Sequence, residues 1–143
     1  MIRQEIYIPK YQWRIHAFFS ISEYWVEPIM DLLWELDCDG DRAKSAYENL
    51  TSGKMNNGIC YSNYAMKESV FVVAKATSAA QFTNSLFHEL THLQSHIGHV
   101  YFLDPQGEAI AYLSGEIIMQ MFPKIKHLLC DCCRKEQEDE RIR

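Results

Sequence analysis

The first twenty residues contain two runs in which polar and apolar side chains alternate. Every second residue from 2 to 8 is isoleucine except Gln4, and every second residue from 15 to 21 is apolar. This period of two is typical of a strand with one face against a core. Pro9, which has no N–H group to offer a neighbouring strand, lies between the runs. The pattern therefore predicts two N-terminal strands.

From residue 22 the apolar period becomes helical. Apolar residues recur at spacings of three and four up to Leu36, and Ser22 is placed to cap the N-terminus of this helix. Residues 37–41, which include Gly40, end it. Residues 42–50 predict a second, shorter helix that ends at Ser52-Gly53.

Residues 59–64 and 69–76 are rich in β-branched and aromatic side chains and are separated by four residues. This arrangement predicts a hairpin. Residues 70–73 are apolar without interruption, as in a strand that is buried on both faces.

Two longer helices follow the hairpin. Thr77 or Ser78 is the candidate N-cap of a helix that reaches about residue 97. Asp104-Pro105 has the pattern of an N-cap and first residue of another helix, which reaches about residue 122 and ends at Pro123. The strands precede these helices, so we expect an α+β fold in which a small sheet packs with about four helices. No repeat or linker divides the chain, so residues 1–123 form one expected domain and residues 124–143 a charged C-terminal tail.

Composition agrees with one folded domain, because the 143 residues are 48% hydrophobic and 23% charged. A net charge of -5 argues against nucleic acid as a partner. No apolar run approaches the roughly 18 residues of a membrane span, and the first ten residues lack a signal-peptide core. Five cysteines, three of them within residues 130–133, do not suggest a disulfide framework. We therefore expect a reduced, cytoplasmic protein that binds neither nucleic acid nor membrane.

The helix predicted after Ser78 contains His88-Glu89-Leu90-Thr91-His92, which is the pattern H-E-x-x-H. Two histidines four residues apart project from one side of a helix, so both imidazoles can bind one Zn²⁺ ion. The glutamate beside the first histidine is placed to take a proton from a metal-bound water. Because three fixed positions also arise by chance, the rest of the helix is the test.

The histidines of this helix share a face that is separate from its apolar face. At about 100° per residue, His92, His96 and His99 lie within roughly 80° of His88, whereas Leu90 and the other large apolar residues lie between roughly 120° and 200°. A solvated helix face is usually built from Lys and Glu rather than from histidine. Four histidines on one non-apolar face therefore favour metal binding.

The next helix offers acidic side chains for a third metal ligand. Counted from Glu108, Tyr112 and Glu116 lie within roughly 80°, away from the apolar face. A short connection makes the two helices antiparallel neighbours, so we expect Glu108 to complete a site with His88 and His92. A glutamate in a first helical turn also complements the helix dipole without any ligand, and this alternative stays open.

The remaining candidate ligands lie too far along their helices to bind the same zinc ion. Glu116 lies about 12 Å beyond Glu108, and His96 and His99 lie about 6 and 10 Å beyond His92. Because Zn–N bonds are near 2 Å long, we expect Glu116, His96 and His99 to orient an imidazole ligand or to face the substrate. Tyr112 or a nearby histidine is the candidate for stabilising an oxyanion.

HExxH followed by a glutamate on the next helix resembles the gluzincin-type zinc metallopeptidases. The resemblance covers about residues 78–116 and implies that His88, His92 and Glu108 bind zinc and that Glu89 is the general base. The sixteen-residue gap from His92 to Glu108 is shorter than expected for thermolysin-like enzymes, and their Asn-Glu-x-x-Ser-Asp context is missing.

Two other resemblances are weaker guides to activity. Over most of its length the chain is similar to small HExxH proteins of gut Bacteroidetes and their phages or mobile elements, which implies no particular activity. That similarity is carried by residues 46–50, 61–64, 88–92 and 107–115. Peptide deformylases combine HExxH with an upstream cysteine ligand, for which Cys60 is the candidate, but a cysteine in a strand is more often a small buried apolar residue. We assign no role to Cys130, Cys132 and Cys133 in the tail.

These patterns predict a zinc hydrolase, in the first place a peptidase acting on a peptide or protein, with Glu89 as the general base. In many metallopeptidases an edge strand pairs with the substrate backbone, and residues 69–76 are placed in sequence to do so unless they form a central strand. The alternative is a non-catalytic module, an inhibitor or adaptor of a phage or mobile element. It would bind its partner through aromatic side chains, for which the chain offers Tyr11, Trp13, Tyr24 and Trp34.

Overall fold

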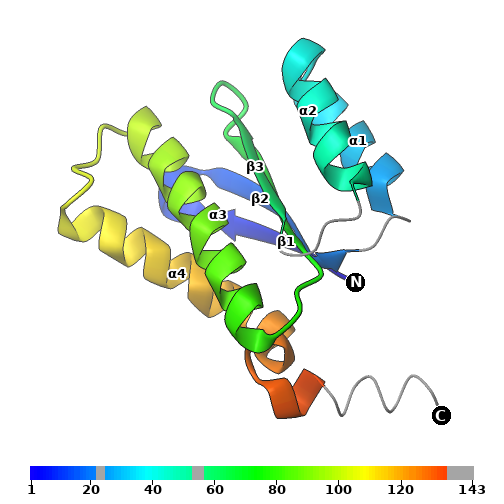
Figure 1. The fold of residues 1–143 in the computed structure, drawn as a ribbon. Helices are drawn as coiled ribbons and strands as arrows, with labels where there is room; N and C mark the ends of the chain where they lie inside the picture. Colours follow the sequence, from blue (N-terminus) through cyan, green and yellow to red (C-terminus); the bar gives the residue numbers. More distant parts are fainter. Residues whose placement is uncertain (22–24, 53–56, 135–143) are drawn as a thin grey trace.

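The computed structural model describes residues 1–21, 25–52 and 57–134 (Figure 1). Ser22 and Tyr24 lie outside these ranges. The fold is of the expected α+β class and combines one sheet with helices on both of its faces. Its elements, in chain order, are β1 (Ile2–Ile8), η1 (Pro9–Tyr11), β2 (Trp13–Ile21), α1 (Val26–Glu35), α2 (Gly40–Thr51), β3 (Gly58–Asn63), β4 (Glu68–Ala74), α3 (Ala79–Val100), α4 (Glu108–Ile125) and η3 (Lys126–Leu129).

The four strands form one sheet in the order β1-β2-β4-β3. β1 pairs antiparallel with β2, β2 pairs parallel with β4, and β4 pairs antiparallel with β3. The predicted N-terminal strands and the predicted hairpin are thus confirmed. β4, which covers most of residues 69–76, is an inner strand, and the strand at this edge of the sheet is β3.

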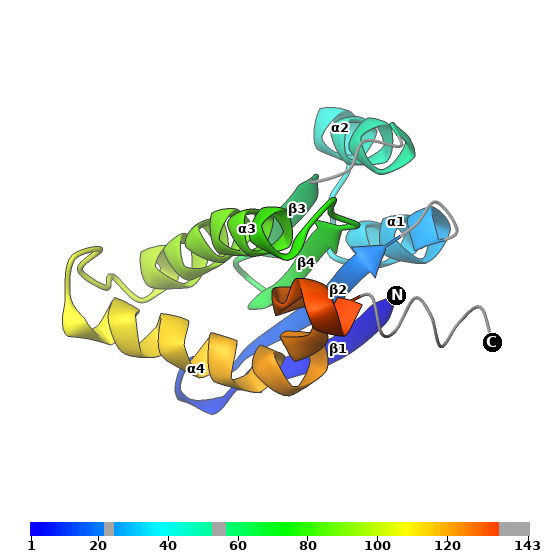
Figure 2. The same cartoon turned by 60° about the horizontal axis from the view of Figure 1, so that its bottom comes forward.

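The sheet separates two helical layers (Figure 2). Side chains of β4 alternate between them: Phe71 and Val73 pack in the cluster that contains α3 and α4, whereas Val70 and Val72 pack with α1 and α2. The uninterrupted apolar run therefore marks a strand buried on both faces, as expected.

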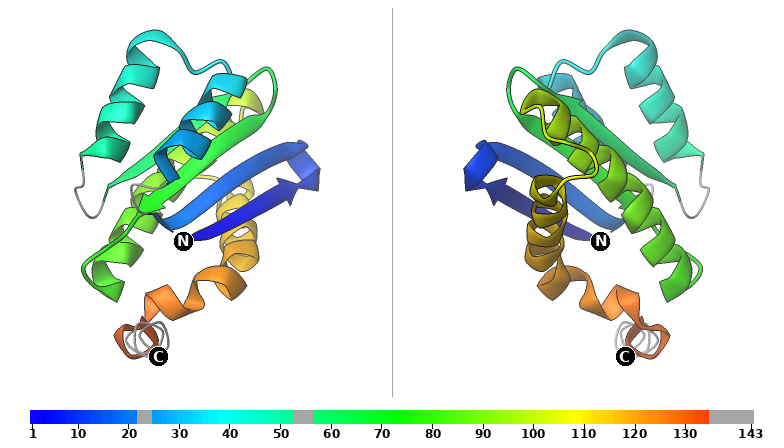
Figure 3. Two further views of the ribbon diagram at one scale, coloured as in Figure 1. Left: turned by 90° about the vertical axis from the view of Figure 1, so that its right-hand side faces the viewer. Right: turned by 90° about the vertical axis from the view of Figure 1, so that its left-hand side faces the viewer.

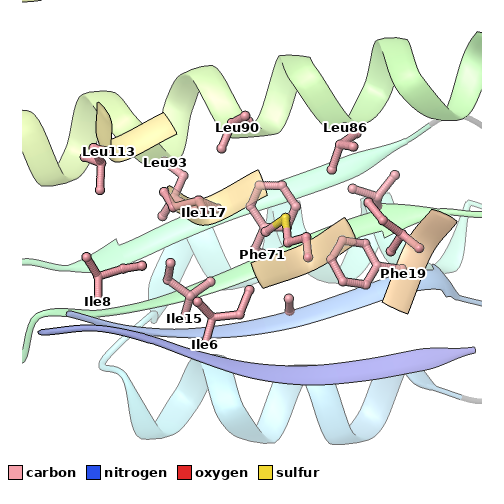
Figure 4. Close-up of a cluster of buried hydrophobic side chains, with 14 of the residues drawn as sticks. Ile6, Ile8, Ile15, Phe19, Phe71, Leu86, Leu90, Leu93, Leu113 and Ile117 are labelled. Atoms are coloured by element: carbon pink, nitrogen blue, oxygen red, sulfur yellow. The ribbon is translucent and has the colours of Figure 1, made fainter. Parts of the chain in front are cut away.

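The larger core lies between the sheet and the pair α3–α4. α3 runs along β3 and β4, and α4 covers β1 (Figure 3). Figure 4 shows leucines of α3 and apolar residues of α4 pointing onto one face of the sheet. The labelled residues of this core are Ile6, Ile8, Ile15, Phe19, Phe71, Leu86, Leu90, Leu93, Leu113 and Ile117.

The ends of the long helices differ in part from the prediction. Ser78 caps α3 as expected, since its Oγ accepts a hydrogen bond from the Gln81 N–H at 3.2 Å. α4 begins at Glu108 rather than at Asp104-Pro105. Asp104 instead closes a turn, in which its Oδ1 accepts from the Gln106 N–H at 3.0 Å and its carbonyl accepts from the Gly107 N–H at 2.9 Å.

The chain beyond Pro123 also belongs to the folded core. α4 continues past Pro123 to Ile125, which is buried, as is Leu128. Asp131 Oδ1 accepts from the Ala79 N–H at 2.8 Å, and the Arg134 guanidinium donates to the carbonyl of Ala76 at 2.6 Å. These contacts fasten the segment up to residue 134 to the start of α3 and to the connection before it, whereas the sequence predicts a separate tail from residue 124.

In the described ranges, no helix combines the length and the apolar character that crossing a membrane requires.

Replacing Phe71 by alanine should lower the free energy of unfolding by about 3–5 kcal/mol, because the ring is fully buried in the inner strand and its loss leaves a cavity. Phe102→Ala is the matched control: its side chain is 94% exposed, so a change within about 0.5 kcal/mol is expected. Urea denaturation followed by circular dichroism measures both. Equal losses in the two variants would contradict the placement of Phe71.

Candidate functional site

The HExxH sequence lies in the middle of α3, and the helix has the two faces that its sequence predicts. Leu86, Leu90 and Leu93 are buried against the sheet. His88 and His92 are exposed on a different side. Their rings are adjacent, with centroids 5.0 Å apart and planes at 73°. A spacing of one helical turn therefore brings two imidazoles within reach of a common ligand.

Glu89 differs from its histidine neighbours in being buried, with 7% of its surface exposed. It packs against Gly58 of β3, where an added Cβ would lie 2.7 Å from both Cγ and Oε1 of the glutamate. Burial raises the pKa of the Glu89 carboxyl above its usual range, and the His88 and His92 imidazoles oppose this shift. The carboxyl is thus held between the histidine helix and the edge strand.

β3 is an edge strand of the sheet and has outward-facing backbone groups beside this helix. Alternate residues of an antiparallel strand direct their N–H and C=O groups to opposite sides. The carbonyl of Asn57 accepts from Ala74 of β4, whereas the carbonyl of Gly58 points outward and accepts from the Asn49 side chain at 3.1 Å. By this alternation, the backbone groups of Cys60 and Ser62 face away from the sheet.

Side chains of β3 continue the site along α3. Ser62 Oγ lies 2.7 Å from His96 Nδ1, and Cys60 Sγ lies 3.9 Å from the same nitrogen. Burial, assisted by the nearby Glu89 carboxylate, raises the pKa of the Cys60 thiol far above its usual range. Burial, and then the neighbouring His92, lower the pKa of His96. Both groups are therefore held neutral.

A cavity of about 850 Å³ follows the outer edge of β3. One wall comes from α2 and the turn before it, and His96 of α3 closes the other side. Its lining is mixed, with charged groups at Asp37, Asp41 and Arg42. His99 lines a separate cavity of about 580 Å³ between α3 and the α3–α4 connection.

The structure does not group Glu108 with His88 and His92 as a set of metal ligands. Ile110, on the same first turn of α4, meets α3 at Gly98, where its Cδ1 would lie 2.7 Å from an added Cβ. Gly98 is ten residues beyond His88, about 15 Å along the helix axis. Glu108 is therefore displaced toward the far end of α3.

Tyr112 and Glu116 face away from α3. α4 contacts α3 through Ser114, whose hydroxyl is hydrogen-bonded to Gln94. Tyr112 and Glu116 lie about 160° around α4 from Ser114, and Tyr112 is 74% exposed. The expectation that this face of α4 would lie across the histidines is thus not met.

Among the residues that the structure describes, no three His, Cys, Asp or Glu side chains are grouped so that they could hold a metal ion. Within the described ranges His88 and His92 have no third metal ligand beside them, and a zinc site at this place stays a prediction. Of the aromatic residues expected to bind a partner in a non-catalytic module, Trp34 lies at the surface and is 70% exposed, but Tyr11 and Trp13 are buried in the core. The aromatic surface open to such a partner is therefore smaller than the sequence predicts.

Sequence reasoning missed the part of the site that β3 contributes. Gly58 carries no signal of its own in the sequence, and for Cys60 the sequence leaves a deformylase-like ligand and a small buried apolar residue as alternatives. Gly58 packs against Glu89 although the two residues are far apart in sequence, so no local pattern predicts this contact. The available signals were the mixed polarity of the strand before the HExxH helix and the similarity of residues 61–64 to small HExxH proteins.

Comparison with known proteins gives no match to a family model, to a curated protein or to a solved structure.

Gly58→Ala should lower the free energy of unfolding by about 1–3 kcal/mol, because the added methyl would overlap Glu89 and lie 2.8 Å from the carbonyl oxygen of Val72. Gly115→Ala is the control: no atom lies within 4 Å of an added Cβ in α4, so it should stabilise the protein by about 0.5–1 kcal/mol. Thermal unfolding monitored by circular dichroism shows whether each variant is destabilised or stabilised. A stabilising Gly58→Ala would show that Glu89 does not pack against β3.

Cys130 should react with iodoacetamide much faster than Cys60 at pH 7. The thiolate is the nucleophile, and hydrogen bonds from the backbone N–H groups and thiols of Cys133 and Cys132 lower the pKa of Cys130, whereas burial raises that of Cys60. Timed alkylation with peptide mass spectrometry measures both rates, which should converge in 6 M guanidinium. Equal rates in the folded protein would contradict the burial of Cys60.

Proposed function

We propose that the protein is a zinc-dependent hydrolase that cleaves amide bonds of peptide substrates at the histidine side of α3. The observation that carries this proposal is the arrangement of HExxH: adjacent, exposed imidazoles of His88 and His92, with the Glu89 carboxyl buried beside them against an edge strand.

The two histidines fit a shared zinc ion, since they are one helical turn apart and their ring centroids are separated by 5.0 Å. When bound, the ion would polarise a carbonyl oxygen and lower the pKa of a water ligand. His88 and His92 are the ligands proposed from this arrangement. The position of Glu108 gives no support to it as the third.

Glu89 has the environment of a general base. A base works best when its pKa approaches the working pH, and burial shifts the pKa of this carboxyl in that direction. The carboxylate accepts a proton from the attacking water and then delivers it to the leaving nitrogen. One amide bond and one water thus give one carboxylic acid and one amine.

The outer edge of β3 favours an extended peptide as the substrate. Outward-facing N–H and C=O groups at Cys60 and Ser62 can pair with a peptide backbone, which would add to the sheet as a further strand. The cavity beside them, about 850 Å³, is large enough for side chains of such a peptide. His96 lines this cavity, and Glu89 packs against Gly58 at the start of the same strand.

The purified protein should bind about one zinc per chain, and Glu89→Gln should keep the metal while lowering kcat for fluorescence-quenched peptides about 10²–10⁴-fold, the usual contribution of a general base. Mass spectrometry of the metal content and a peptide-cleavage assay measure the two effects.

His88→Ala and His92→Ala should each lose zinc, whereas His99→Ala, an exposed histidine of the same helix, should retain it. Zinc binding that survives the double replacement of His88 and His92 would refute the proposed ligands. A protein that binds no zinc even after reconstitution would end the hydrolase proposal.

A further inference from the structure

A chain of hydrogen bonds runs from the core of the protein to His96. Trp13 Nε1 donates to Ser69 Oγ at 2.8 Å, Ser69 Oγ lies 2.6 Å from Ser62 Oγ, and Ser62 Oγ lies 2.7 Å from His96 Nδ1. Its members come from β2, β4, β3 and α3 in turn. The chain therefore links the inner strands of the sheet to the candidate site.

Trp13, the first residue of the chain, determines in which direction the hydrogen bonds are donated. An indole N–H can only donate, so Ser69 Oγ is an acceptor toward Trp13. Both Trp13 and Ser69 are fully buried, and a buried hydroxyl hydrogen without an acceptor costs about 1–3 kcal/mol. Within the described part of the chain, Ser62 is the other hydrogen-bond partner of the Ser69 side chain, so the Ser69 hydroxyl donates to Ser62.

The direction of donation also bears on the hydrogen bond between Ser62 and the His96 imidazole. With its oxygen accepting from Ser69, the Ser62 hydroxyl still has its own hydrogen to donate, and His96 Nδ1, 2.7 Å away, can accept it. A neutral imidazole has one acceptor and one donor nitrogen, so in this arrangement the proton of His96 is on Nε2. No hydrogen-bond partner for Nε2 occurs among residues 1–21, 25–52 and 57–134, and the ring lines the cavity beside β3.

We propose that Trp13, Ser69 and Ser62 hold His96 as the Nε2–H tautomer, and that this N–H donates to the carbonyl oxygen of the substrate as negative charge develops on it. The second part rests on the proposed hydrolase function. His96 is then the residue that contacts the substrate, and the two serines and Trp13 are positioning residues.

This assignment separates His96 from the two histidines before it. A metal ligand must offer a lone pair, and Nδ1 is occupied by Ser62 while Nε2 carries the hydrogen. The stripe of histidines on α3 therefore divides by role. His88 and His92 are exposed and available to an ion, and His96 is fixed as a donor by its contact with β3.

Long-range ¹H–¹⁵N correlation spectra of histidine-labelled protein at pH 8 report the tautomer of each imidazole, and His96→Gln assigns the His96 signals. Wild-type His96 should show the Nε2–H pattern alone. Ser62→Ala and Ser69→Ala should give a mixture of tautomers, because each removes the fixed direction of the chain. Ser95→Ala, which changes an exposed serine of the same helix, should leave the wild-type pattern.

An Nδ1–H pattern in the wild type, or an unchanged Nε2–H pattern in Ser62→Ala, would overturn the tautomer assignment. Titration with Zn²⁺ separates this outcome from failure of the hydrolase proposal. Resonances of His88 and His92 should shift while the Nε2–H signals of His96 persist. Loss of the His96 N–H on zinc binding would overturn its role as donor, and no response from His88 or His92 would overturn the zinc site.

Peptide cleavage tests the contact with the substrate. His96→Phe should lower kcat about 10²–10³-fold, the cost of removing one donor to a developing oxyanion. His96→Gln, which keeps an N–H group, should recover part of this loss, and zinc content should be unchanged in both. Equal activity of His96→Phe and wild type would refute the donor role.

Discussion

Burial of β4 on both faces is the constraint on which the arrangement of the other elements depends. Its side chains alternate between two apolar clusters, so helices must cover both sides of the sheet. An inner strand also needs a hydrogen-bonding neighbour on each side, which β2 and β3 supply. The hairpin connection places β3 outermost, and β3 thereby becomes the edge that the candidate site uses.

The position of α3 follows from the same strand. Only residues 75–78 separate β4 from α3, so the helix must pack close to the sheet, and its leucines turn toward Phe71. The opposite, polar side of α3 then lies over the edge of the sheet, where Glu89 meets Gly58. Absence of a side chain at Gly58 is what allows this approach. A helix carrying HExxH and the edge strand β3 are thus brought together by packing of the core.

Local patterns predicted the strands, the hairpin, the Ser78 cap and the two faces of α3, because each depends on residues close in sequence. They did not predict which side of α4 meets α3. Both sides of α4 were compatible with its own periodicity, and the choice is made by contacts of Ser114 with Gln94 and of Ile110 with Gly98. The grouping of Glu108 with the histidines depended on that choice. Burial of Trp13 could not be predicted from local patterns either, because it depends on strands that follow later in the chain.

The polar groups in the core connect stability with the candidate site. A fully buried indole N–H requires an acceptor, and a buried serine that accepts it requires an acceptor of its own. Each donor therefore needs an acceptor on the next element, from β2 to β4 and from β4 to β3. The last acceptor is an imidazole at the edge of a cavity. Such a chain is stable in an apolar sheet when every member is satisfied. The hydrogen bonding of the core therefore dictates which nitrogen of His96 remains for a ligand, and a change as remote as Trp13 acts on the site through two hydroxyl groups.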